Sequence, residues 1–345
     1  MKKEVKIICA MLSVLMLFSV CGCRSTPEIF SSSEASSTPA SVVETTSEEA
    51  PTSSEEVTAQ PEAPVITPSA PTQSQTPSYQ SKPAVITQPK PTVSLGYEVL
   101  DPDNTRGLSE VRSGFGFGVA QNGQPHSISV NNQLKFDSLS NVNALALDTI
   151  STDKRMYLTF DCGYEYNNLT ASILDTLKAK NVKAAFFCTL DYLEDNPQLV
   201  KRMIDEGHIV GNHSATHPDF STINRTEMAN EIYLVDKYLK DNFSYTAKYF
   251  RFPSGAHSDS ALDLVTSVGY SSVFWSVAYS DWNTSAQPEI ESAFNTVTSR
   301  YHSGAVILLH AVSATNDAIL SRLIDKALAD GYYFKTLDEY PKFAQ

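Results

Sequence analysis

Beyond residue 150 the sequence alternates short apolar runs with longer amphipathic segments, and this alternation restricts the fold more than any other feature. Short runs bounded by turn residues predict strands, and the segments between them predict helices, so the pattern is typical of successive strand–helix units in a parallel sheet. Strands are predicted at Tyr157–Phe160, Ala184–Cys188, His208–Val210, Lys248–Phe250, Ser272–Trp275, Ala305–Leu309 and Tyr332–Lys335. This spacing predicts an α/β barrel of seven or eight units, with a doubly wound open sheet as the alternative.

Helix boundaries are marked by residues with known capping roles. Asn224 and Glu227 have the spacing of a capping box, in which each side chain accepts a hydrogen bond from the other residue's backbone N–H. Gly207, Gly269 and Gly331 stand where predicted helices end, and glycine readily adopts the left-handed conformation that closes a helix. These signals support the division of the chain into strand–helix units.

The N-terminal part of the chain has a different composition. Residues 1–22 combine three early lysines with a short apolar run and end in Val-Cys-Gly, which predicts a signal peptide, and Cys23 then matches the acylated cysteine of a bacterial lipobox. Ordinary cleavage and an uncleaved anchor are the alternatives. Residues 23–94 hold most of the 18 prolines among Ser, Thr and Glu, which predicts a disordered tether. Residues 95–150 are expected to form an N-terminal layer of the folded domain, whose main part spans 151–345.

The charge balance excludes one class of partner. The chain carries 26 Lys and Arg against 39 Asp and Glu, a net charge of -13. Because nucleic-acid binding depends on clustered positive charge, a DNA or RNA partner is disfavoured. We expect a monomer attached by lipid to the outer face of the bacterial membrane.

Polar residues follow the predicted strands at the carboxyl end. They are Asp161, His213, Arg251, Asp281 and His310. The carboxyl ends of parallel barrel strands share one face, and that face holds the active site, so these residues are predicted to meet in one pocket.

Two histidines four residues apart give the strongest metal signal. His213 and His217 would present two imidazoles to one ion if the segment formed a helical turn, and zinc fits such ligands. Asp161 is a candidate base, and a thiolate at Cys162 would complete a three-ligand set with an open position for water or substrate. The sequence therefore predicts one divalent metal ion, with zinc as the first choice.

These residues stand in motifs that resemble those of the NodB-homology polysaccharide deacetylases, carbohydrate esterase family 4. In chain order the motifs are TFDCG (159–163), HSATH (213–217), RFPSG (251–255), Asp281-Trp282 and ILLH (307–310). Within the family, the segments TFDCGYE, GHIVGNHSATHPD, VFWSVAYSDW and GAVILLHAVSATNDA most resemble the peptidoglycan N-acetylmuramic acid deacetylases that prepare muramic δ-lactam. The resemblance implies a deformed barrel and hydrolysis of an N-acetyl group.

The resemblance also implies a role for each matching residue. Asp161 would be the general base and Arg251 would orient it, while His310 would be the acid that protonates the leaving amine, tuned by Asp281. His213 and His217 would hold the metal ion. Amide hydrolysis needs a deprotonated water, a positive centre near the oxyanion and a proton donor for nitrogen, and these groups supply all three. Substrate-binding positions would be Ser254, through its backbone N–H, with Trp282 and Leu308 as pocket walls.

One position departs from the family pattern. The usual motif is TFDDG, whose second Asp is a metal ligand, but here Cys162 stands in its place. Three interpretations compete: a soft third ligand that favours zinc, a non-ligating thiol beside a two-histidine site, and a disulfide with Cys188. The first is our working hypothesis.

The expected function is deacetylation of peptidoglycan amino sugars, with N-acetylmuramic acid as the first candidate. The alternatives are an N-acetylglucosamine deacetylase, an O-deacetylase of xylan-like polysaccharide, and a carbohydrate-binding pseudoenzyme without turnover.

Overall fold

A computed structural model describes residues 98–344. The predicted signal peptide (1–22), the acylation site Cys23 and the tether (23–94) lie outside the described residues. The strands are β1 Ala144–Leu145, β2 Arg155–Cys162, β3 Ala185–Cys188, β4 Ile209–Asn212, β5 Tyr249–Phe250, β6 Ser271–Val273, β7 Val306–His310 and β8 Tyr333–Phe334. The α-helices are α1 Ser127–Ser138, α2 Leu169–Ala179, α3 Leu190–Asp195, α4 Pro197–Asp205, α5 Arg225–Phe243, α6 Asp259–Ser267, α7 Ile290–Thr298 and α8 Ala314–Ala329.

The strands form one parallel sheet in the order β1-β6-β5-β4-β3-β2-β7, and β8 pairs with the start of β2. From β2 to β6 each strand lies beside the next strand in the sequence, without the reversal of order that defines a doubly wound sheet. The segment after β6 reaches β7, where Val277 and Ile307 form a parallel bridge. The sheet therefore curls into a deformed barrel, and the predicted α/β barrel is confirmed.

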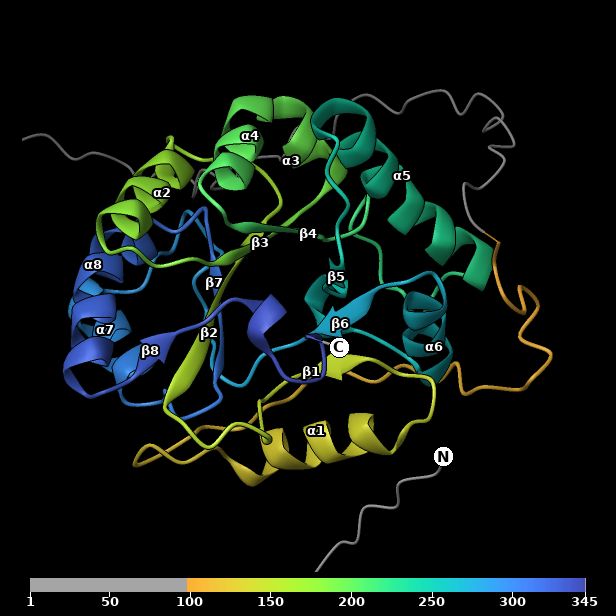
Figure 1. The fold of residues 1–345 in the computed structure, drawn as a ribbon, viewed down its shortest axis with the longest axis horizontal. Coiled ribbons are helices and arrows are strands. Elements are labelled where there is room, and N and C mark those ends of the chain that lie inside the picture. The colour runs from red at the N-terminus through yellow and green to blue at the C-terminus, as the bar shows by residue number, and fades with distance from the viewer. Residues whose placement is uncertain (1–97, 345) are drawn as a thin grey trace, which may run out of the picture. The chain divides into compact units, whose positions relative to one another are not determined.

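The helices form an outer ring around the strands (Figure 1), as a parallel barrel requires. The predicted capping box is present at α5, where the Asn224 side chain accepts from the Glu227 backbone N–H and the Glu227 side chain accepts from the Asn224 backbone N–H. Gly207, Gly269 and Gly331 all adopt positive φ at helix ends, as predicted. None of the helices between residues 98 and 344 combines the length and apolarity that crossing a bilayer requires.

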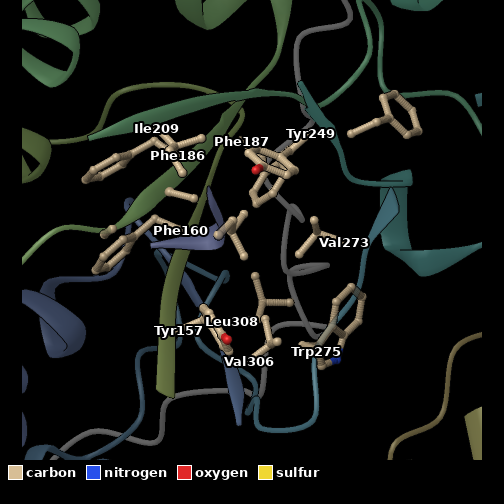
Figure 2. Close-up of a cluster of buried hydrophobic side chains, with 14 of the residues drawn as sticks. Tyr157, Phe160, Phe186, Phe187, Ile209, Tyr249, Val273, Trp275, Val306 and Leu308 are labelled. Carbon is tan, nitrogen blue, oxygen red and sulfur yellow. The ribbon is translucent and has the colours of Figure 1, made fainter. Parts of the chain in front are cut away.

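Alternation along β2 separates the site from the core. Phe160 and Phe186, which are in register on β2 and β3, point outward toward the helices and stack with ring centroids 5.2 Å apart (Figure 2). Thr159 and Asp161 point the other way, into the barrel, where they bind Arg251. Successive residues of a strand face opposite sides, so the apolar positions build the core and the polar ones reach the pocket.

Residues 98–150 are an integral part of the barrel. Their pattern predicts no strand, yet β1 pairs with β6 because its two residues are fully apolar and buried against the sheet. Two residues cannot be detected by periodicity, which needs a longer window. Phe115 from the same region stacks on Phe274, with ring centroids 4.5 Å apart. Asp148 accepts a hydrogen bond from the buried Tyr157 hydroxyl at 2.7 Å.

Candidate active site

Residues from the carboxyl ends of several strands meet at one cavity of about 1120 Å³. The cavity is lined by Asp161 at the end of β2, by His213 and His217 after β4, by Ser254 after β5 and by His310 at the end of β7. Arg251 and Asp281 are fully buried behind this lining. The convergence that the strand-end pattern predicts is therefore present.

Asp161 and Arg251 form a buried ion pair. The Arg251 Nη1 donates to Asp161 Oδ1 at 2.7 Å, and the two side chains come from β2 and from the segment directly after β5. Burial opposes ionisation of the carboxyl group, but the positive charge of Arg251 and the neighbouring histidines hold the pKa of Asp161 below its ordinary value. Asp161 is therefore an ionised carboxylate in the cavity wall.

The Arg251 guanidinium is fixed on every side. It donates to the backbone oxygen of Val273 at 3.0 Å and to the Thr159 hydroxyl at 2.9 Å, and it lies 4.1 Å from the ring centre of Phe187. Phe187 has room in this position because its neighbour on β4 is Gly211, where a Cβ would come within 2.5 Å of the Phe187 ring. The small residue on β4 thus permits the stacking that orients the arginine.

Asp281 and His310 form a second acid–base pair, and His310 on β7 is the register partner of Asp161 on the neighbouring strand β2. The Asp281 carboxylate, wholly buried, accepts from His310 Nδ1 at 2.7 Å and from the His310 backbone N–H at 2.8 Å. Burial disfavours the charged imidazole, but the hydrogen bond and the charge of Asp281 outweigh that effect and raise the pKa of His310. Because Nδ1 is occupied, the Nε2 atom is the one left for a ligand in the cavity.

Two further residues hold this pair, and sequence reasoning did not identify them. Asn316 on α8 donates to Asp281 at 2.6 Å and to the backbone oxygen of His310 at 3.1 Å. The Tyr279 hydroxyl donates to the Asn316 side-chain oxygen at 2.5 Å. Both residues lie inside segments that resemble the family's motifs. A single Asn or Tyr does not form a spacing pattern that would mark it as a site residue. Their role depends on where α8 meets the loop after β6.

The segment from His213 to His217 is a loop, so the predicted helical turn is wrong. Ser214 and His217 both have positive φ. The Asn212 side chain accepts from the Ser214 backbone N–H at 2.9 Å, and the Ser214 hydroxyl accepts from the His217 backbone N–H at 3.0 Å. These local side-chain bonds stabilise a turn in place of a helix. The loop still brings the two imidazoles together, with ring centroids 4.9 Å apart.

The two imidazoles have the state that a metal ligand needs. Burial lowers the pKa of His213 to about 4 and also lowers the pKa of His217, so both rings are neutral near pH 7. His213 Nδ1 lies 2.9 Å from the Arg251 backbone oxygen, which requires a proton on Nδ1 and leaves Nε2 as an acceptor. That Nε2 faces Asp161 Oδ2 at 3.5 Å. Two acceptors that face each other fit a cation bound between or beside them.

Cys162 does not join this group, contrary to our prediction of a third ligand. The residue is fully buried and is absent from the cavity lining, although its neighbours Asp161 and Gly163 both line it. Strand alternation turns the thiol to the opposite face of the sheet, where Cys162 lies in register with Cys188 on β3. Both thiols are free. Within residues 98–344 no group of three His, Cys, Asp or Glu side chains has the arrangement of a metal site.

The predicted substrate-binding residues all line the cavity. Trp282 is 55% exposed and its ring centre lies 5.9 Å from that of His310, so its indole forms part of the open rim. Leu308 is buried and also lines the cavity. Ser254 has φ of 54°, a left-handed conformation in the short helix Pro253–Gly255.

Known proteins resemble this chain over the part that contains the site. The profile of the family described as polysaccharide deacetylase matches residues 149–273. The peptidoglycan-N-acetylmuramic acid deacetylase PdaA of Bacillus subtilis is 40% identical over 191 residues, which cover 54% of this chain and 71% of the relative. The chain belongs to the polysaccharide deacetylase family, carbohydrate esterase family 4.

Solved structures of the family agree with this assignment. The structure of Bacillus subtilis PdaA, a family 4 carbohydrate esterase, superposes with a TM-score of 0.63 at 35% identity and covers 69% of this chain and 100% of that chain. A second relative, a peptidoglycan-N-acetylglucosamine deacetylase of Bacillus cereus, is 35% identical over 185 residues, covering 52% of this chain and 66% of the relative. The relatives of this deacetylase thus include one named for N-acetylmuramic acid and one named for N-acetylglucosamine.

Proposed function

We propose that this protein is a metal-dependent de-N-acetylase of peptidoglycan that acts on N-acetylmuramic acid. One observation carries the proposal: an ionised carboxylate held by a buried arginine and an imidazole held by a buried carboxylate line the same cavity. Hydrolysis of an amide needs a base for water and an acid for the leaving nitrogen, and the two pairs provide groups of opposite protonation state.

Asp161 acts as the general base in this proposal. Its lowered pKa keeps it ionised near pH 7, and the bond from Arg251 fixes one oxygen while the other remains available to accept a proton. His310 acts as the general acid. Its raised pKa increases the protonated fraction near pH 7, and the Asp281 bond at Nδ1 directs Nε2 toward the leaving amine. Ser254 supports the oxyanion, and Trp282 and Leu308 enclose the acetyl group.

His213 and His217 would hold one divalent metal ion, and zinc suits neutral imidazole ligands. When bound, such an ion polarises the acetyl carbonyl and makes a water molecule more acidic. The bare Nε2 of His213 beside Asp161 supports this assignment. Metal analysis of the purified protein tests it, because His213→Ala and His217→Ala should each lose most of the metal.

The activity is tested by release of primary amine from peptidoglycan. We expect the wild-type protein to release amine and Asp161→Asn to release none, and we expect dialysis against a chelator to abolish the reaction. Asp325→Asn, which alters an exposed carboxylate bound to Lys180 on the outer surface, is the matched control. Mass spectrometry of the digested product would place the free amine on muramic acid. Amine on glucosamine, acetate release from acetylated xylan, or binding without turnover would each favour one of the alternatives.

The protein is further proposed to be exported and lipid-anchored through Cys23, and to act as a monomer. The lipobox-like ending at residues 20–23 supports the anchor. Cys23→Ala should move the protein from the membrane fraction to the medium, whereas Cys21→Ala should not. Light scattering after size exclusion tests the monomer.

A further inference from the structure

Arg300 is a cation in the cavity wall, and no carboxylate between residues 98 and 344 forms an ion pair with it. It directly follows Ser299, which caps the carboxyl end of α7, and it is half-buried. With the described part of the chain the guanidinium makes one hydrogen bond, from Nη1 to the Ala278 backbone oxygen at 3.3 Å. Every other arginine between residues 98 and 344 forms an ion pair with Asp or Glu, namely Arg106, Arg112, Arg155, Arg202, Arg225, Arg251 and Arg322.

The free donors of Arg300 fit an anion. A guanidinium carries five N–H donors and no acceptor, and its planar fork matches the two oxygens of a carboxylate. The single bond to Ala278 holds the side chain against the cavity wall and leaves the remaining donors unused. The other arginine near the cavity, Arg251, is already committed to Asp161. Arg300 is thus the arginine of this site that a negatively charged ligand can recruit.

The backbone oxygen that Arg300 binds lies close to His310 along the strand direction. Ala278 follows Val277, which pairs with Ile307 on β7, so Ala278 lies level with Leu308. From there His310 is two residues further, about 7 Å along the strand direction at the usual rise per residue. A sugar bound with its acetamido group at His310 would therefore bring a substituent on the neighbouring carbon within reach of the long Arg300 side chain.

We propose that Arg300 binds the lactyl carboxylate of muramic acid and so selects muramic acid over glucosamine. The two acetylated sugars share the acetamido group on C2, and muramic acid adds a lactyl ether on the adjacent C3. That ether ends in a carboxyl group, which is negatively charged when no peptide is attached. The anion would otherwise enter a cavity that already contains Asp161, so a paired cation lowers the cost of its burial. This inference rests on the proposed function and names the residue that sets its substrate.

The test compares two substrates that differ only in that charge. One is a muramic acid glycan with a free lactyl carboxylate, and the other is the same glycan with the carboxyl converted to a neutral carboxamide. We expect the wild type to prefer the carboxylate by roughly tenfold to a hundredfold in kcat/KM, the range for a hydrogen bond to a charged group. Arg300→Gln should reduce this ratio to near one, mainly through KM, and Arg300→Lys should retain part of it.

The ratio of the two kcat/KM values is measured with one protein sample. A smaller fraction of folded protein therefore lowers both values equally and leaves their ratio unchanged. Arg322→Gln, which removes an exposed arginine bound to Glu291, is the control and should leave the ratio unchanged. An unchanged ratio in Arg300→Gln, or a wild type without preference for the carboxylate, would overturn the inference.

A second measurement separates this inference from the proposed function. In an Asp161→Asn background, NMR titration with the two glycans reports binding without turnover. If the wild type released no amine from any glycan, the proposed function would fail. The role of Arg300 would still be supported if the protein bound the carboxylate glycan more tightly than the carboxamide glycan and if Arg300→Gln removed that difference. Equal binding of both glycans would contradict that role.

Discussion

The substitution Asp281→Asn tests how the second acid–base pair works. The carboxylate accepts three hydrogen bonds, two from His310 and one from Asn316. An amide can accept at only one of its two ends. Because Oδ2 receives two donors and Oδ1 receives one, the Asn amide should turn its NH₂ group toward His310 Nδ1. That atom must then accept a hydrogen bond, which moves the proton of the neutral ring to Nε2.

The magnitudes follow from these contacts. Loss of the hydrogen bond to a charged group costs about 1.5–3 kcal/mol of folding free energy. The pKa of His310 should fall, because burial remains while the Asp281 charge that opposed it is gone. A neutral imidazole is a weak acid, so kcat should fall by about 10²–10⁴-fold, the usual contribution of a general acid. The alkaline limb of the pH–rate profile should move to lower pH.

The pH dependence of stability has a defined sign. The pKa of His310 is raised in the folded protein, so its stabilising contribution is fully present below the unfolded pKa of about 6.5 and is lost as pH rises through the folded pKa. The difference in unfolding free energy between the wild type and Asp281→Asn should therefore be largest in acid and should shrink as the pH rises.

Histidine NMR measures the effect without any substrate. Long-range ¹H–¹⁵N spectra report the tautomer and the titration of each ring, and His310→Ala identifies the relevant signals among the seven histidines. We expect the wild-type ring to carry its proton on Nδ1 and to titrate above pH 6.5, and the variant ring to carry it on Nε2 and to titrate lower. If the His310 signals titrate at the same pH in both proteins, the argument that Asp281 controls this residue is refuted.

Three further substitutions test other parts of the structure. Asn316→Leu removes the amide that holds Asp281 and should lower kcat and reduce the free energy of unfolding by about 1–3 kcal/mol, measured by kinetics and urea denaturation. Cys162→Ser should keep the wild-type metal stoichiometry, because the thiol faces away from the cavity, and metal loss in this variant would restore the ligand hypothesis. Arg225→Met leaves the buried Asp263 without one cation and should destabilise the protein by about 3–5 kcal/mol in urea denaturation, and a loss below 1 kcal/mol would contradict it.

Local patterns in the sequence were enough to predict the strand–helix units. Each predicted strand is present with its ends shifted by at most two residues, because a short apolar run bounded by turn residues is a local signal. The strand that was not predicted is β1, whose two residues join the sheet through the neighbouring β6. The capping box of α5 is equally local and was predicted correctly.

The sequence alone also determined which side of the barrel holds the site. Asp161 and His310 both lie at the carboxyl ends of their strands, and parallel strands bring all such ends to one face. Tertiary structure decided the rest. Alternation at the end of β2 sends Asp161 into the cavity and Cys162 away from it, and local bonds made by Ser214 replace the expected helical turn. These outcomes depend on register and on contacts between distant segments, and a linear pattern does not contain that information.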